Sequence, residues 1–176
     1  MKTTQRDSLP SPGSQVIIRP CRPADLPAVA RLAARLVREH HAMDPLRFMI
    51  FDHIEEGYTA YLGGEIRKKH SLVLVAADAA GILGYAYGRI EPRDWNALRE
   101  KCGVLHDVYV DEGARHRGIG TQLVSEMVRR LGSLGAPRVV LMTAVQNTKA
   151  HRVFERLGFR ITMLEMTREC APNSHD

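Results

Sequence analysis

The chain has 176 residues, of which 44% are hydrophobic and 26% charged, as in an ordinary globular protein with one well-packed core. No stretch approaches the roughly 18 consecutive apolar residues of a membrane helix, and the N-terminus lacks the basic start and apolar run of a secretory signal. We therefore expect a cytoplasmic protein that makes no membrane contact.

Cysteine usage and charge exclude further classes. Cys21, Cys102 and Cys170 are an odd number at wide spacings with no Cys-x-x-Cys pair, which argues against a disulfide framework and against a bound metal. The formal net charge of +5 is dispersed along the chain, and no aromatic residues alternate with the basic ones. We expect no nucleic acid partner, whereas the charge suits a small polyanionic ligand.

The first half of the chain predicts a tail, a strand and two helices. Residues 1–15 are polar, carry Ser, Pro and Gly without periodicity, and are expected to form a flexible tail. Residues 16–19 predict a short strand. Apolar residues at helical spacing predict helices over residues 23–41 and 53–69, although three glycines weaken the second.

The middle of the chain predicts three strands. Residues 71–77 and 82–90 form an expected antiparallel hairpin, because a short turn joins them. A polar connection over residues 91–103 leads to a strand over residues 104–110. The turn at residues 111–114 then precedes the most informative segment of the sequence.

The last third predicts two helices and two strands. A helix is expected from Gly118 to Gly135, and residues 138–145 are an almost unbroken apolar run typical of a buried central strand. Asn147 begins a short helix that ends at Gly158, and residues 159–167 predict a final strand. These elements indicate one α/β domain over residues 16–170 with a mixed sheet, followed by a loose tail over residues 171–176. The strand–helix–strand crossover makes its two strands parallel.

The segment 115–121 reads Arg-His-Arg-Gly-Ile-Gly-Thr, directly after a strand and a turn. The first backbone N–H groups of a helix have no internal partner, and the helix dipole adds partial positive charge there. Gly118 and Gly120 let a phosphate approach those groups, while Arg115 and Arg117 add full charges. The pattern suits a pyrophosphate, although by itself a tight strand-to-helix turn explains it equally well.

Two other phosphate-binding motifs fit less well. A Walker loop needs Gly-Lys-Ser/Thr, which the segment lacks. A dinucleotide fingerprint needs a third glycine where Leu123 stands, and it follows the first strand of a domain rather than the fourth.

Arg115-x-x-Gly118-x-Gly120 after a strand, followed by Asn147-x-x-Ala150 and Leu157-Gly158-Phe159, resembles the GNAT superfamily of acyl-CoA-dependent N-acyltransferases. The resemblance covers about residues 16–167. It implies a central mixed sheet of six to seven strands with about four helices. It also implies that the parallel strands 104–110 and 139–145 splay apart at their C-terminal ends, with the pantetheine arm of acetyl-CoA in the gap.

The resemblance also implies site residues. Unpaired backbone groups at the splay should bind the two pantetheine amides like a false strand. The implied cofactor-binding positions are Val108 and Val110 for pantetheine; Arg115, Arg117, Gly118, Ile119, Gly120 and Thr121 for pyrophosphate; Asn147 for the arm; and Phe154 close by.

Transfer to an amine needs a base, a stabilised oxyanion and a tolerable leaving group. The Val108 N–H is the candidate oxyanion donor. Many relatives carry a tyrosine as general acid where this chain has Phe154, and thiolate leaves tolerably without help. His106 stands where some relatives have a glutamate base, and Asp107 is the second candidate. Strand alternation would place these two side chains on opposite faces unless a bulge intervenes.

The expected function is therefore transfer of an acetyl group from acetyl-CoA to a primary amine of a small molecule, peptide or protein. The alternative is a catalytically weak CoA-binding regulatory or sensor module, which Phe154 keeps open. The sequence does not identify the acceptor, and its exposed strand edges leave room for a homodimer.

Overall fold

A computed structural model describes residues 15–170, so most of the expected N-terminal tail and all of the expected tail at 171–176 lie outside the described residues. One mixed sheet organises the fold, and its strands stand in the order β1-β2-β3-β4-β5. Their bounds are β1 Ile17–Pro20, β2 Ser71–Asp78, β3 Gly81–Glu91, β4 Cys102–Val110 and β5 Val139–Leu141.

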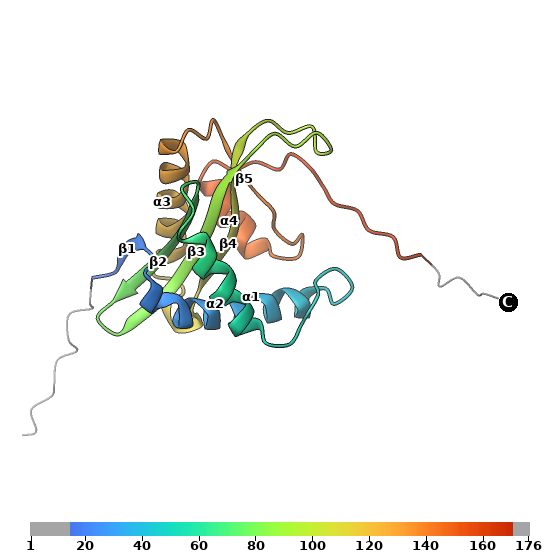
Figure 1. Cartoon of the computed structure of the whole chain (residues 1–176). Coiled ribbons are helices and arrows are strands. Elements are labelled where there is room, and N and C mark those ends of the chain that lie inside the picture. The colour runs from blue at the N-terminus through green and yellow to red at the C-terminus, as the bar shows by residue number, and fades with distance from the viewer. Residues whose placement is uncertain (1–14, 171–176) are drawn as a thin grey trace, which may run out of the picture.

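Four α-helices and two 3-10 turns complete the described chain (Figure 1). The helices are α1 Leu26–Met43, α2 Ile54–Glu65, α3 Ile119–Ser133 and α4 Thr148–Arg156, and the turns are η1 Pro23–Asp25 and η2 Glu112–Ala114. The predicted helices all form. The second ends earlier than expected, at Glu65 instead of residue 69.

The sheet confirms the mixed α/β class and the strand directions. The pairs β1–β2, β2–β3 and β3–β4 are antiparallel, and β4–β5 is parallel. The α3 crossover imposes that parallel direction, because a long connection returns the chain to the starting edge of the sheet. The strand count differs from the expectation: the described residues contain five strands, not six to seven.

Helices cover both faces of the sheet and make two cores (Figure 1). On one face α1 and α2 bury Val29, Leu62, Tyr85 and other side chains. On the other face α3 and α4 bury Leu74, Met127, Phe154 and their neighbours. The strand β3 is buried on both faces, since Tyr85 belongs to the first core and Ala86 to the second. The sheet therefore forms a rigid middle layer for the site.

The expected final strand over residues 159–167 does not form. Those residues have no strand assignment, and Figure 1 shows the segment leaving the body of the protein. Ile161, Met163, Leu164 and Met166 are each at least 69% exposed. A strand forms only on an available edge, and β5 offers just three residues to pair with. An ion pair between Arg47 and Glu165 connects the segment to the loop after α1.

The strand expected over residues 138–145 is also shorter than predicted. It ends at Leu141, and Met142 and Val145 are 82% and 72% exposed. Hydrophobicity made this run resemble a central strand. Its pairing with β4 ends after Leu141, and a pattern of residue types does not encode where a partner strand is lost.

A substitution at Gly84 tests the close approach of β3 and β4 in the observed register. A Cβ at Gly84 would lie 2.7 Å from the backbone carbonyl oxygen of Tyr109. We expect Gly84→Ala to lower the free energy of unfolding by about 1–3 kcal/mol, because backbone must shift to accept the methyl group. Urea denaturation followed by circular dichroism measures this loss.

Gly132→Ala in α3 is the matched control, since no atom lies within 4 Å of its added Cβ. Its expected effect is a gain of about 0.5–1 kcal/mol from the better helix propensity of alanine. Equal stability of the Gly84→Ala variant and the unchanged protein would contradict the register described here.

Candidate functional site

The two parallel strands β4 and β5 are joined only at their beginnings. Pairing runs from Gly103 opposite Val139 to Leu105 opposite Leu141 and then stops. The remainder of β4, from His106 to Val110, lacks this neighbour, while Asp107–Val110 stay paired with β3. The parallel pairing thus ends where the expected divergence of the two strands would begin.

The divergence exposes backbone groups of β4. The N–H of Asp111 donates to the carbonyl of Leu83 at 2.8 Å, so alternation directs the backbone of Tyr109 toward β3 and that of Val108 and Val110 toward the gap. The Val110 carbonyl accepts a bond from Nε of Arg115 at 3.1 Å. The polar groups of Val108 and the Val110 N–H remain directed at the gap, as expected for pantetheine ligands.

A helix N-terminus stands next to this gap. Gly118 caps α3 in the left-handed region at φ 74°, a conformation that glycine adopts without strain. Gln122 makes the first backbone bond of the helix, to the Gly118 carbonyl at 3.1 Å. The N–H groups of Ile119, Gly120 and Thr121 precede it and have no intrahelical partner. Because Gly118 has no atom within 4 Å of an added Cβ, the approach from outside is open. These residues fit a diphosphate.

The two arginines of the motif differ in their surroundings. Arg115 donates to Glu39 at 2.8 Å and lies over the Tyr109 ring at 5.2 Å, so it fixes the turn before α3 against α1. Arg117 is 43% exposed and lies 3.9 Å from Asp78, which leaves its guanidinium accessible to an anion. Direct phosphate contact by either residue stays a prediction.

The motif Asn147-x-x-Ala150 forms the start of α4, and Phe154 is the buried residue of this helix. The side-chain oxygen Oδ1 of Asn147 accepts a hydrogen bond from the backbone N–H of Ala150 at 3.3 Å, which confirms the helix cap. Phe154 is 9% exposed and packs edge-on against Phe159, with ring centroids 5.9 Å apart. The structure thus places Phe154 in the core on the α3–α4 face, and its side chain has no proton to give.

A β-bulge changes the expected placement of the two candidate bases. Tyr87 of β3 faces Asp107, whereas Gly88 faces Leu105, so His106 is an extra residue in β4. His106 stacks on Tyr87 at 5.1 Å, and Asp107 accepts from the hydroxyl of Tyr85 at 3.1 Å. Both tyrosines belong to the α1–α2 face. The exception stated for a bulge therefore applies: the extra residue resets the alternation, and both side chains share one face.

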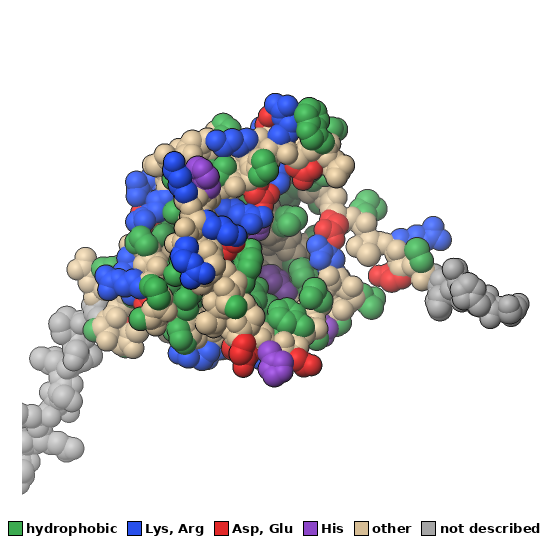
Figure 2. All heavy atoms as spheres, viewed as in Figure 1, with side chains coloured by type: hydrophobic (Ala, Val, Ile, Leu, Met, Phe, Trp, Pro, Cys, Tyr) green, Lys and Arg blue, Asp and Glu red, His purple; other side chains and the backbone are tan. Residues whose placement is uncertain are grey.

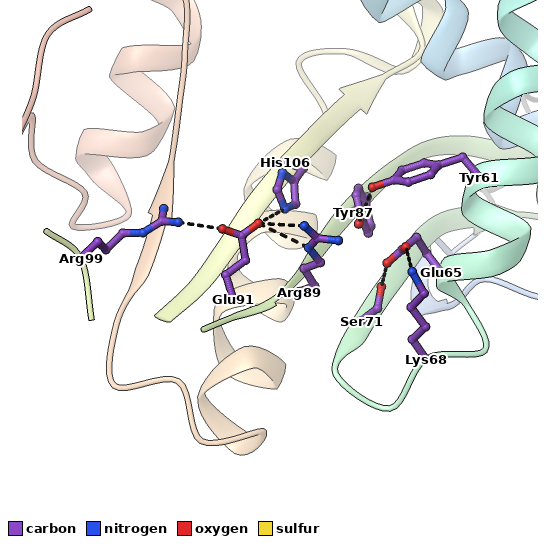
Figure 3. A network of polar contacts seen from close by, with 9 residues as sticks. All are labelled: Tyr61, Glu65, Lys68, Ser71, Tyr87, Arg89, Glu91, Arg99 and His106. Atoms are coloured by element: carbon purple, nitrogen blue, oxygen red, sulfur yellow. Dashed lines mark hydrogen bonds and ion pairs between the residues drawn. The ribbon is translucent and has the colours of Figure 1, made fainter. Parts of the chain in front are cut away.

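Glu91 orients the imidazole of His106 (Figure 3). Nε2 of His106 lies 3.1 Å from Oε1 of Glu91. The same oxygen accepts a hydrogen bond from Arg89 at 3.2 Å, and the other oxygen, Oε2, accepts one from Arg99 at 2.7 Å. Burial alone would raise the pKa of Glu91, but the bonds from Arg89 and Arg99 and the charge of His106 lower it. The ionised carboxylate holds a proton on Nε2 and leaves Nδ1 as the basic atom.

The pKa values of both candidates are shifted by burial. Burial lowers the pKa of His106, against the opposing charge and hydrogen bond of Glu91, and so favours the neutral imidazole. Burial raises the pKa of Asp107 to about 6, against the opposing hydrogen bond from Tyr85. Two titratable groups with shifted pKa values therefore face the same side of the sheet, which is typical of an acid–base site.

Sequence reasoning missed the importance of the polar network around His106. By sequence, Glu91 falls in the polar connection over residues 91–103 and Glu65 falls within the helix predicted over residues 53–69. In the structure Glu65 is 1% exposed and binds Ser71 at 2.8 Å and Lys68 (Figure 3). Only the alternation of Tyr87, Arg89 and Glu91 along β3 could have suggested that these side chains share a face.

Within residues 15–170, no three His, Cys, Asp or Glu side chains come close enough together to hold a metal ion. None of the helices described has both the length and the apolar character needed to cross a membrane.

Comparison with known proteins gives consistent results. Residues 34–159 match the family model described as acetyltransferase (GNAT) family. The L-methionine sulfoximine/L-methionine sulfone acetyltransferase of Pseudomonas paraeruginosa is 37% identical over 93 residues, which are 51% of this chain and 51% of that protein. The match thus spans about half the length of this curated relative.

Solved structures share the fold. A tetramutant of the BH1408 protein of Bacillus halodurans has a TM-score of 0.76 at 22% identity, covering 88% of this chain and 99% of that one. The aminoglycoside N-acetyltransferase AAC(6')-Iy, solved in complex with CoA, has a TM-score of 0.71 at 20% identity, covering 93% of this chain and 99% of that one. At these identities the likeness shows the fold alone.

Asp107 makes stability depend on pH in a defined direction. Between about pH 4 and pH 6 the folded carboxyl keeps a proton that the unfolded chain has released, so its contribution to stability falls as pH rises. Asp107→Asn removes this dependence. We expect the variant to gain about 1–3 kcal/mol relative to the unchanged protein between pH 4 and pH 7.5. Urea denaturation at both pH values measures the difference.

Asp52→Asn is the control, because it removes an exposed carboxylate with the same change of charge. A pH-dependent gain for Asp107→Asn no larger than that of the control would show that Asp107 is not held in a desolvating environment.

Proposed function

Because the chain belongs to the acetyltransferase (GNAT) family, whose model matches residues 34–159, we propose that it transfers an acetyl group from acetyl-CoA to a primary amine. One observation carries the proposal. Where β4 leaves β5, unpaired backbone groups of β4 line a gap, and the free N–H groups at the start of α3 stand beside it. A linear amide-bearing ligand with a diphosphate at one end matches both features.

The cofactor would be held by backbone rather than by many side chains. In this proposal Val108 and Val110 pair with the amides of the pantetheine arm, and the amides of Ile119, Gly120 and Thr121 bind the diphosphate. Arg117 adds a full positive charge from its exposed position. The helix cap occupies the side-chain oxygen of Asn147, so its amide N–H₂ would be the group that contacts the same arm.

His106 would accept the proton of the acceptor amine. An alkylammonium has a pKa near 10, so the amine must lose a proton before it attacks a thioester. Nδ1 of His106 is the available basic atom because Glu91 occupies Nε2. Asp107 remains the second candidate, since its raised pKa would also let it take up a proton near neutrality.

The N–H of Val108, which points into the gap, would donate a hydrogen bond to the thioester carbonyl oxygen, on which negative charge develops. No acid at position 154 is needed, because a thiol pKa of about 8.5 makes thiolate an acceptable leaving group. The position of the acceptor follows from the bulge: His106 and Asp107 both face the side of α1 and α2, so the amine would enter from that side.

Relatives support acetyl transfer without fixing the acceptor. The similar Pseudomonas protein is named for L-methionine sulfoximine and L-methionine sulfone, which favours a small-molecule acceptor here. The experiment that tests the function mixes the protein with acetyl-CoA and a panel of small amines and peptides, and follows the release of free thiol. Tight CoA binding without thiol release from any amine would instead favour a regulatory or sensor module.

Gly120 tests the diphosphate site. We expect Gly120→Glu to weaken CoA binding by at least about 100-fold, because a carboxylate would face a diphosphate at the helix N-terminus. The fold should survive, since an added Cβ meets only a Val110 methyl group at 3.7 Å. Isothermal titration calorimetry with CoA measures the change.

Gly132→Glu carries the same change of charge in the same helix and should bind CoA normally, because it stands near the other end of α3. Normal CoA binding by Gly120→Glu would remove the N-terminus of α3 from the cofactor site.

His106 tests the base. We expect His106→Ala to lower kcat/KM by roughly 10²–10⁴-fold, the usual range for general acid–base catalysis. In the unchanged protein kcat/KM should rise with pH through a pKa below the ordinary histidine value, and the variant should lose this step. Thiol release measured between pH 5 and 9 gives both results.

Asp107→Asn serves as the comparison, because it removes the other titrating group on this face. If the step near neutrality survives in His106→Ala and disappears in Asp107→Asn, Asp107 is the base. A profile unchanged in both variants would place the base elsewhere.

A further inference from the structure

An open hollow of about 720 Å³ lies beyond the C-terminal end of α2, between the chain that follows this helix and the connection from β3 to β4. Its lining includes residues on both sides of the polar network in Figure 3, among them Lys69, Arg89, Glu91 and Arg99. Figure 2 shows lysine and arginine side chains gathered over the upper part of this face of the protein. Of the residues that line the hollow, the proposed acetyl transfer uses only Glu91, through its contact with His106.

The hollow carries an excess of positive charge. Five lysine and arginine side chains line it, against the three carboxylates of Glu65, Glu91 and Asp94. Each carboxylate already has partners: Glu65 binds Ser71 and Lys68, Glu91 binds two arginines, and Asp94 accepts the backbone N–H groups of residues 96 and 97 at 3.0 Å. The acidic groups are therefore unavailable to a cationic ligand.

The cations of the hollow are less completely paired than its carboxylates. Lys69 makes no ion pair with any residue in the described range 15–170. Nε of Arg99 is buried and has no hydrogen-bond acceptor among the described residues. Arg93 binds Glu100 at 3.0 Å and lies 4.9 Å over the ring of Trp95, which is 73% exposed. The hollow thus offers positive charge and an aromatic wall to a ligand that bears a carboxylate.

Glu91 connects this hollow to the candidate base. Its side chain lines the hollow and binds Nε2 of His106 at 3.1 Å. Both residues lie on the α1–α2 face of the sheet, from which the acceptor would enter. An acceptor whose amine reaches His106 would therefore extend its other substituent toward the hollow.

We propose that this hollow is an acceptor subsite that binds the carboxylate of a small carboxylate-bearing primary amine, with Lys69 and Arg93 supplying the charge. The inference rests on the proposed acetyl transfer and adds the chemical class of its acceptor. A neutral or purely cationic amine would leave the excess charge of the hollow uncompensated, so the subsite selects by charge as well as by shape.

The experiment compares amino acids with their own carboxamides as acceptors of acetyl from acetyl-CoA. Because the amide changes the basicity of the amine, kcat/KM is calculated per unprotonated amine. We expect the unchanged protein to prefer the acid by about tenfold or more, in line with a charge-assisted contact. In Lys69→Gln/Arg93→Gln this preference should fall by about fivefold or more, because two partly exposed cations are lost.

Lys101→Gln/Arg138→Gln is the matched control. Both residues are exposed and lie outside the hollow, and the net charge changes by the same amount. The control should keep the preference of the unchanged protein. Equal use of acids and amides by the unchanged protein, or an unaltered preference in Lys69→Gln/Arg93→Gln, would overturn the subsite.

Calorimetric titration of the same amino acids into the protein with CoA separates this inference from the proposed function. Binding that weakens in Lys69→Gln/Arg93→Gln, without thiol release from any amine, would support the subsite and overturn the transferase. Transfer to amides as fast as to acids would overturn the subsite and leave the transferase intact. Failure to bind or acetylate any amino acid would overturn the subsite.

Discussion

The structure depends on one interrupted pairing, the parallel contact of β4 with β5 that stops after Leu105 and Leu141. Beyond that point every second residue of β4 directs backbone groups away from β3, and buried groups without partners cost stability. The protein meets part of this need itself, since Arg115 binds the Val110 carbonyl. The groups left over define a linear site with the repeat of a β-strand, so a ligand that mimics a strand fits best.

Rigidity around the gap is what makes an interrupted pairing tolerable. The strand β3 is buried on both faces and stays paired with β4 along the length that β5 leaves open. Close approach of the two strands at Gly84 and Gly88 leaves no space for a side chain. A site built on such strands keeps its geometry, as preorganised hydrogen-bond donors require.

The bulge at His106 decides how the chemistry is arranged. One extra residue brings His106 and Asp107 to the same face, away from α3 and toward α1 and α2. The backbone at one end of β4 would therefore bind the cofactor, and the amine that accepts the acetyl group would lose its proton on one face of the same strand. Glu91 then extends the polar site along β3 toward the positively charged hollow.

The sequence by itself determined the helices, the hairpin, the parallel crossover and the motif at the start of α3. These depend on residue periodicity and on short-range turn and cap chemistry, such as that of Gly118 and Asn147. Only the tertiary structure decided the end of β5, the failure of residues 159–167 to form a strand, and the common face of His106 and Asp107. Each of these depends on which neighbour a strand finds and in what register, and hydrophobic pattern alone carries no information about an absent partner or an extra residue.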